Sequence, residues 1–294
     1  MSSSAPSLTA LFDRRAWRAH RNRAAAGGVD FLHDEIGDRL LDRLDLVNRE
    51  FPDVLDLGAR HGALAGRLAK RKGTERVVMA EPAIQFLARA SGARVAADPE
   101  LVPFRDAGFD LVVGNLVLHW AADLPGALVQ LRRVLKPDGL LLAGMFGGQT
   151  LVELRTALFE AELAEEGGVS PRVSPAVELG DAAALLTRAG YALPVADSET
   201  ITVAYPDLPA LMRDLRGIGE TNALTARRRG FMRRTTLARA ALIYAERFAE
   251  PDGNIPATFE VLYLCGWAPH PSQPKPLPRG SATTRLADAL KPKD

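Results

Sequence analysis

The sequence predicts an α/β fold, a mostly parallel sheet with helices on both faces. From Asp53 onward, short apolar segments alternate with helical patterns, which is typical of parallel strands joined by crossover helices. Two late segments alternate apolar and polar residues, so we expect an antiparallel hairpin at the sheet edge with a helical insertion between its strands. A glycine-containing turn follows the first strand. Open parallel sheets bind ligands at the carboxyl ends of their strands, so this turn is a candidate ligand site.

Apolar periodicity defines the expected elements. Before the sheet, the apolar residues between Phe31 and Val47 predict a helix with one buried face. The predicted strands lie at 53–57, 76–81, 93–97, 109–114, 139–145, 200–205 and 259–263. The predicted helices that follow the first strand lie at 62–71, 83–90, 124–135, 148–165 and 176–189. A turn is predicted at Lys136-Pro137-Asp138-Gly139, because proline ends helices and Asp-Gly favours turns.

The chain divides into four predicted regions. Residues 1–50 form a basic arm and a helix that cap the site, and residues 51–206 form the ligand-binding domain. Residues 207–249 form a helical insertion, either a lid or a partner surface, and residues 250–294 form the last strand and a proline-rich tail. The arm carries five arginines between Ala10 and Ala26. It is either an amphipathic helix that touches a partner or closes over a site, or a solvated basic arm anchored by one or two aromatic residues.

Composition narrows the function classes. The 294 residues carry a formal net charge of +1, which argues for neither a nucleic-acid partner nor an acidic membrane surface. The one cysteine, Cys265, excludes an intramolecular disulfide and a four-cysteine zinc site. Without Cys-x-x-Cys, His-x-Asp or His-Glu-x-x-His motifs, no metal site is predicted. No apolar run reaches the roughly 18 residues of a membrane-spanning helix.

The first strand ends in Asp56, followed by a turn with Gly58, Arg60 and Gly62. Glycines there allow a ligand to approach the backbone, and Asp56 can accept a hydrogen bond from a cationic ligand group. The usual nucleotide-binding turn reads Gly-x-Gly-x-Gly, so Arg60 replaces the middle glycine. Its side chain either obstructs the ligand or binds a ligand carboxylate through its planar guanidinium.

Two further acids end the next strands. Glu81 ends the second strand about 20 residues after the glycine-containing turn, where an acid binds the ribose hydroxyls of a nucleoside. Asp98 follows the third strand, where it can accept from the exocyclic amine of an adenine. The alternative is that these acids are solvated strand ends. Together they predict a cofactor that contains adenosine.

The fourth strand is followed by Asn115, which can face the cofactor or substrate, and by His119 and Trp120. The last two are expected to form the floor of a substrate pocket, together with Trp17 from the arm. His119 is the candidate catalytic base, because an imidazole side chain can accept and release a proton near neutral pH. The alternative is a packed histidine–tryptophan pair that shapes the turn.

These motifs resemble the class I methyltransferase superfamily, which has a Rossmann-like fold and binds S-adenosylmethionine. Within it the chain is most similar to the respiratory complex I assembly factors known as arginine hydroxylases. The stretches that carry this similarity are Leu11-Phe12-Asp13-Arg14, Leu118-His119-Trp120, Met145-Phe146-Gly147-Gly148, Glu166-Gly167-Gly168, Gly219-Glu220-Thr221-Asn222 and Arg279-Gly280-Ser281. The methyltransferases that esterify malonyl carrier protein resemble it more distantly.

The resemblance implies S-adenosylmethionine as cofactor and Asp56, Gly58, Arg60, Gly62, Glu81, Asp98 and Asn115 as cofactor-binding residues. It implies a protein substrate, an arginine on an iron–sulfur subunit of complex I, and peripheral membrane association without a membrane span. The similarity begins near Leu11, too early for a transit peptide, so we expect a bacterial cytoplasmic protein. It also implies an ordered tail at Ala268–Gly280.

Three hypotheses follow. The first is an assembly factor that binds S-adenosylmethionine and hydroxylates a protein arginine. The second is a methyltransferase that acts on a carboxylate or hydroxyl of a small or carrier-bound substrate. The third is a non-catalytic assembly chaperone with a degenerate cofactor site, which Arg60 motivates.

Overall fold

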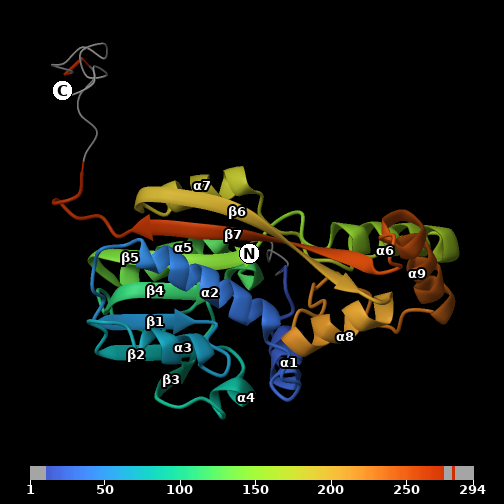
Figure 1. Ribbon diagram of the computed structural model, residues 1–294, viewed down its shortest axis with the longest axis horizontal. Coiled ribbons are helices and arrows are strands. Elements are labelled where there is room, and N and C mark those ends of the chain that lie inside the picture. Colours follow the sequence, from blue (N-terminus) through green and yellow to red (C-terminus); the bar gives the residue numbers. More distant parts are fainter. Residues whose placement is uncertain (1–10, 275–279, 282–294) are drawn as a thin grey trace, which may run out of the picture.

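The computed structural model describes residues 11–274 and 280–281, which form a seven-stranded mixed sheet of order β3-β2-β1-β4-β5-β7-β6 (Figure 1). Strands β1 to β5 run parallel, whereas β7 lies antiparallel between β5 and β6. The strands are β1 (Asp53–Leu57), β2 (Arg76–Glu81), β3 (Ala93–Ala96), β4 (Phe109–Asn115), β5 (Leu135–Phe146), β6 (Ala192–Tyr205) and β7 (Ile255–Trp267). The predicted α/β class and its antiparallel edge hairpin are confirmed.

Helices cover both faces of the parallel part of the sheet. On one face lie α2 (Phe31–Asp45) and α3 (Ala63–Leu68), and on the other lie α5 (Leu124–Val134) and α7 (Leu179–Arg188). Successive residues of one strand point to opposite faces, so Val54 joins one core and Leu55 joins the other. The central strands β1, β4 and β5 are therefore buried on both sides, as the alternation of strands and helices predicted.

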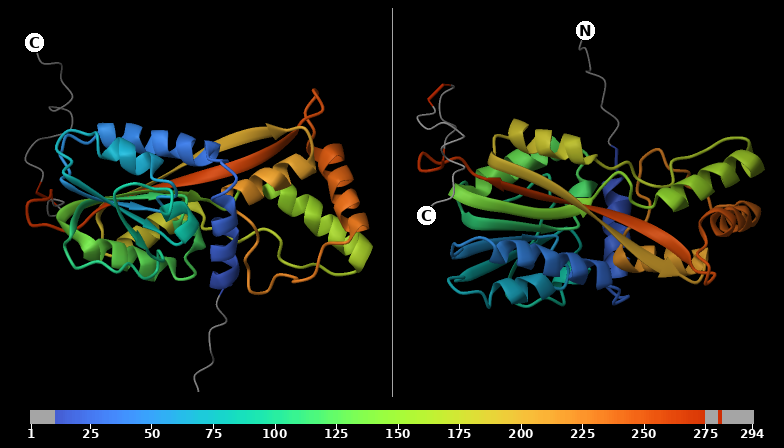
Figure 2. Two further views of the ribbon diagram at one scale, coloured as in Figure 1. Left: turned by 90° about the horizontal axis from the view of Figure 1, so that it is seen from below. Right: turned by 45° about the horizontal axis from the view of Figure 1, so that its top comes forward.

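The hairpin β6–β7 extends beyond the parallel strands and carries a cluster of helices (Figure 1; Figure 2). These are α6 (Val152–Glu166), α8 (Leu208–Ile218) and α9 (Arg234–Phe248). Helices α8 and α9 lie within the predicted insertion at 207–249, while the four-region division of the chain remains a prediction. Helix α1 (Arg14–Ala24) packs against α8 and against α4 (Ile84–Leu87), beside the carboxyl edge of the parallel strands.

The sequence underestimated the last three strands. β6 and β7 pair along almost their whole length. Many positions of β6 are exposed and polar residues are tolerated there, so the apolar pattern that predicts a strand is weak over much of its length. The predicted turn at 136–139 lies within β5 as an irregularity, where the register shifts and Asp138 adopts a positive φ of 63°. Lys136 fixes this segment, because its Nζ donates to Asp53 and Asp110 at 2.8 Å.

Several predicted helices are too long at their ends. The clearest cases are 62–71, of which 63–68 is helical, and 83–90, of which 84–87 is helical. Of the tail expected to be ordered, residues 275–279 lie outside the described part. Gln273 does contact the domain, because its Nε2 donates to Asp138 Oδ1 at 2.8 Å. Within 11–274 and 280–281, no helix is both long and apolar enough to cross a membrane.

Candidate functional site

The turn after β1 requires its two glycines for packing. Gly58 has a φ of 80°, and a Cβ there would lie 2.8 Å from the Asn115 carbonyl oxygen. Gly62 has a φ of 84°, and a Cβ there would lie 2.7 Å from Met79 Sδ. A side chain at either position would clash as well as adopt a strained backbone. The chain's own packing therefore demands both glycines, whatever ligand the turn meets.

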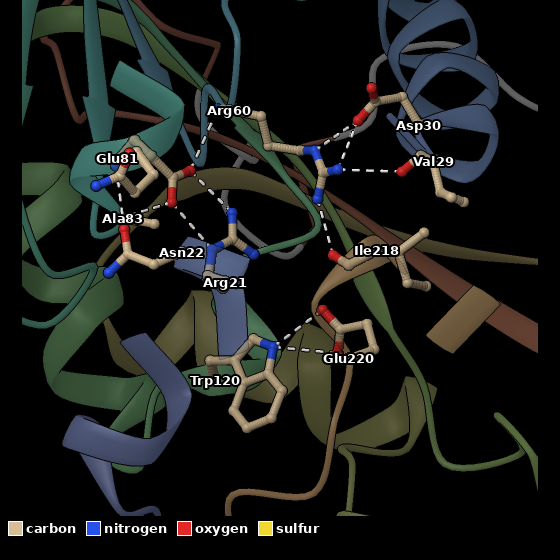
Figure 3. A network of polar contacts seen from close by, with 11 residues as sticks. Arg21, Asn22, Val29, Asp30, Arg60, Glu81, Ala83, Trp120, Ile218 and Glu220 are labelled. Carbon is tan, nitrogen blue, oxygen red and sulfur yellow. Dashed lines mark hydrogen bonds and ion pairs between the residues drawn. The ribbon is translucent and has the colours of Figure 1, made fainter. Parts of the chain in front are cut away.

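Arg60, the unusual residue of this turn, binds other parts of the chain (Figure 3). Its Nε donates to Asp30 Oδ1 at 2.9 Å and its Nη1 donates to the Ile218 carbonyl at 2.8 Å. Its Nη2 donates to the Val29 carbonyl at 3.1 Å, and the guanidinium lies 4.3 Å from the centre of the Phe86 ring. Arg60 thus ties the first turn to the start of α2 and the end of α8. Neither role weighed from the sequence describes these contacts.

Beside this turn lies a cavity of about 300 Å³, which we call the inner cavity. Its buried polar lining has several atoms without a well-aligned hydrogen-bond partner among the described residues, namely both carboxylate oxygens of Asp56, both ring nitrogens of His33 and Oδ1 of Asn115. Burial, with the charge of Glu81, raises the pKa of Asp56 to about 7. Burial and the charges of Arg60 and Arg21 hold the pKa of His33 well below its usual value. Buried polar groups of this kind ordinarily have partners, so the inner cavity is ready for a polar ligand.

Glu81, at the end of β2, is paired with an arginine of α1. Arg21 Nε donates to Glu81 Oε1 at 3.0 Å and Arg21 Nη2 donates to Oε2 at 2.8 Å, and both side chains are fully buried (Figure 3). The backbone N–H groups of Arg60 and Ala83 donate to the same carboxylate at 3.2 and 3.0 Å. The carboxylate that was expected to bind ribose hydroxyls therefore already has four donors.

Asp98 is paired in the same way. Arg14 donates to both of its oxygens, from Nε to Oδ2 at 3.1 Å and from Nη2 to Oδ1, and Arg18 Nη2 donates to Oδ2 at 3.3 Å. Burial opposes the ionisation of Asp98, but hydrogen bonds from Arg14 and from the Glu100 backbone outweigh it and lower the pKa. We call Glu81 and Asp98 the paired acids.

The sequence missed the partners of the paired acids. Arg14, Arg18 and Arg21 follow one another at i, i+4 and i+7, which places them on one face of α1. That spacing is visible in the sequence, but it does not say which face of the domain the helix covers. In the structure α1 lies over this edge of the sheet, which favours a helix that closes over the site rather than a solvated arm.

The second candidate site is a cavity of about 230 Å³, which we call the apolar cavity. His119 and Trp120 line it as expected, together with Glu220, which the sequence singled out only through the family resemblance. Trp120 Nε1 donates to both Glu220 oxygens at 3.1 Å, and His119 Nε2 lies 3.2 Å from Oε2. Burial opposes the ionisation of Glu220, but the charge of His119 and these hydrogen bonds lower its pKa.

Trp17 does not line the apolar cavity, contrary to the expectation. It is a fully buried residue of α1, and its ring centre lies 5.7 Å from that of Trp120. It belongs to the same core as Phe12 and Leu224, so apolar packing holds it away from the cavity. Within the described ranges, no group of three or more His, Cys, Asp or Glu residues could hold a metal ion.

Comparison with known proteins shows the family to which the chain belongs. A family profile described as a methyltransferase domain matches residues 55–143. The arginine-hydroxylase NDUFAF5 of Danio rerio is 41% identical over 96% of this chain and 90% of its own length. The human protein of that name is 40% identical over 97% of this chain and 85% of its own. A malonyl-[acyl-carrier protein] O-methyltransferase of Xylella fastidiosa is 36% identical over 89% and 90%.

Solved structures share the fold at low identity. YcgJ of Bacillus subtilis superposes with a TM-score of 0.55 at 16% identity, over 79% of this chain and 98% of its own. A phosphoethanolamine N-methyltransferase of Haemonchus contortus, solved with S-adenosylhomocysteine, has a TM-score of 0.50 at 15% identity, over 79% and 53%. These structures show that the chain has the methyltransferase fold. The relatives that match nearly the whole chain show the family within that superfamily. The chain belongs to the family of the NDUFAF5 arginine hydroxylases, within the methyltransferase superfamily.

Proposed function

We propose that this chain binds S-adenosylmethionine at the carboxyl edge of its parallel strands. The inner cavity supports the proposal, because its unpartnered atoms on Asp56, His33 and Asn115 suit the amino and carboxylate groups of the methionine end. Glu81 and Asp98 would hold the ribose and the adenine. The cofactor, when bound, supplies an electrophilic methyl group.

The residues fit this cofactor only partly in the conformation described. The paired acids already accept hydrogen bonds from Arg14, Arg18 and Arg21. A carboxylate lone pair that is used by an arginine is not free for a hydroxyl or amino group of the nucleoside. We therefore propose that α1 leaves the paired acids when the cofactor binds. The cost of separating a buried ion pair would lower the apparent affinity for the cofactor.

We further propose that the chain hydroxylates an arginine on an iron–sulfur subunit of respiratory complex I during its assembly. The single observation that carries this is the likeness to proteins named arginine hydroxylases over nearly the whole chain. Converting a C–H bond into a C–OH bond is a two-electron oxidation that inserts one oxygen atom. With dioxygen as oxidant, the step also consumes two electrons and two protons and releases one water, and these reactants would have to come from outside the chain. We place the protein in the cytoplasm, with peripheral contact to the inner membrane.

His119 is the proposed proton acceptor. Its Nε2 donates to Glu220, which fixes the ring and leaves Nδ1 as the acceptor nitrogen. Among the described residues, Nδ1 accepts from the backbone N–H of Phe146, at the long distance of 3.5 Å. A substrate proton could replace this weak contact.

A second candidate is methylation of a carboxylate, which the carrier-protein O-methyltransferases among the relatives favour. Mass spectrometry of the complex I iron–sulfur subunit, isolated from a strain with and without this gene, separates the candidates. An arginine with one added oxygen only when the gene is present supports hydroxylation, and an added methyl group supports methylation. An unmodified subunit together with lost complex I assembly would support the non-catalytic chaperone.

A further inference from the structure

The apolar cavity contains one buried negative charge. Among its described lining residues, Glu220 is the only acid, and its side chain is 10% exposed. We propose that this cavity binds the side chain of the substrate arginine and that its guanidinium pairs with Glu220. The inference rests on the proposed arginine substrate and adds where that arginine binds.

Glu220 has unused capacity for a cation. An ionised carboxylate can accept about four hydrogen bonds, and Glu220 receives contacts from Trp120 Nε1 and His119 Nε2. The Trp120 indole is a neutral donor, so its contact solvates the charge of Glu220 without cancelling it. A carboxylate buried among apolar side chains strongly favours a cationic partner.

The nearby arginines are bound elsewhere or exposed. The charge of Arg21 also lowers the pKa of Glu220, but its guanidinium is bound to Glu81. Arg172 lines the cavity, but its Nε donates to Glu162 Oε1 at 2.8 Å and its Nη2 pairs with the same carboxylate. Arg216 also lines the cavity and its side chain is exposed to solvent. In the part of the chain that the structure describes, the ion-pair partner of Glu220 is His119.

The cavity walls suit a long aliphatic stem with a cationic tip. The lining is dominated by apolar side chains, namely Phe146, Leu151, Leu154, Leu158, Met212 and Phe259. Its volume of about 230 Å³ lies below the roughly 300–1,000 Å³ of typical small-molecule pockets, and suits one inserted side chain. The Trp120 and Phe146 rings can add cation–π attraction. A planar guanidinium matches a carboxylate with two parallel hydrogen bonds, which an ammonium cannot form.

The apolar cavity also adjoins the proposed cofactor site. Trp120 connects the two, because its indole binds Glu220 while its carbonyl oxygen accepts from Arg14 Nη1 at 2.6 Å. Arg14 in turn binds Asp98. Figure 3 shows the Trp120–Glu220 contacts and the Arg21–Glu81 pair in one view, and the charge of Glu220 acts on Arg21. An arginine held by Glu220 would therefore lie beside the edge where the cofactor binds.

Peptide binding to the full chain tests the inference without requiring turnover. The probes are acetyl-Gly-Arg-Gly-amide and the same peptide with citrulline, which keeps the shape of the side chain and removes its charge. Calorimetry on the unmodified chain should show about tenfold or more tighter binding of the arginine peptide. In Glu220→Gln this preference should fall to near one. Glu165→Gln, an exposed acid of α6, is the matched control and should keep the full preference.

Met212→Trp provides a second test that leaves Glu220 in place and does not depend on the fold of Glu220→Gln. Filling the cavity should abolish binding of both peptides. The inference is wrong if the unmodified chain binds neither peptide or does not prefer arginine, or if the preference survives in Glu220→Gln. The peptide experiment can fail independently of the proposed function. If peptide binding depends on Glu220 but the iron–sulfur subunit is unmodified, the proposed hydroxylation is wrong and the arginine-binding cavity stands.

Discussion

The paired acids and the inner cavity are neighbouring parts of one sheet edge. The paired acids have hydrogen-bond donors from the chain, whereas several buried polar groups of the inner cavity lack well-aligned partners. Glu81 is fully buried and receives four donors, two of them from Arg21 of α1. Asp56, one strand away, is equally buried and lacks a well-aligned partner for either oxygen. The chain's own arginines thus bind the acids in one half of the edge, whereas the polar groups of the other half lack such partners. If the cofactor binds at this edge as proposed, α1, rather than the first turn, would control access to it.

Removing the Arg21 side chain should have the largest effect. In Arg21→Met the Glu81 carboxylate loses its buried partner, so the free energy of unfolding should fall by about 3–5 kcal/mol. Denaturant titration measures the loss, and added S-adenosylmethionine should restore part of it. Arg15→Met, an exposed position of the same helix, should change stability little. Equal stability of the two variants would contradict a close pairing in solution.

The buried Asp56 carboxyl of the inner cavity should make the stability of the chain depend on pH. A folded-state pKa of about 7 for Asp56 lies above its unfolded value, so the stabilising contribution is full below about pH 4 and is lost as pH rises to about 7. The loss amounts to about 2–4 kcal/mol. Asp56→Asn removes this term, so the difference in unfolding free energy between variant and unmodified chain should shift by that amount between pH 4 and 8. A constant difference across this range would show that Asp56 has found a partner.

Arg60 should matter for stability more than for the ligand. Arg60→Gly loses hydrogen bonds to Asp30 and to two backbone carbonyls, which costs about 1–3 kcal/mol, while glycine relieves the positive φ of 49°. Arg60→Ala loses the same bonds without that relief and should be about 1 kcal/mol less stable than the glycine variant. Both should bind S-adenosylmethionine about as well as the unmodified chain. A large loss of affinity in both would instead make Arg60 a cofactor ligand.

The smallest effect is expected at Arg18. Its side chain is half exposed, and it gives Asp98 a single hydrogen bond at 3.3 Å beside the two from Arg14. Arg18→Ala should therefore cost less than about 1 kcal/mol in thermal denaturation, and less at high salt. A loss as large as that of Arg21→Met would mean that the paired acids are held equally tightly.

The sequence predicted the sheet and its acids more reliably than it predicted what those acids bind. Short apolar strands and their end residues are local features, so Asp56, Glu81 and Asn115 could be placed at one edge before the structure was known. The pairing of Arg21 with Glu81 joins residues 60 positions apart, and no local pattern specifies it. The long β6–β7 ladder was underestimated for the same reason, since pairing between strands extends it beyond their apolar segments. Glu220 was visible only through the family resemblance, because its role depends on two side chains about 100 residues away.

The central claim is that α1 occupies the place of the nucleoside and competes with it. Calorimetric titration of S-adenosylmethionine into the unmodified chain, Arg21→Met and Arg15→Met tests this most directly. Freeing Glu81 should make Arg21→Met bind about tenfold tighter or more than the unmodified chain, with Arg15→Met unchanged. An equal or weaker affinity in a folded Arg21→Met would contradict the account, and would mean that the helix supports cofactor binding instead of opposing it.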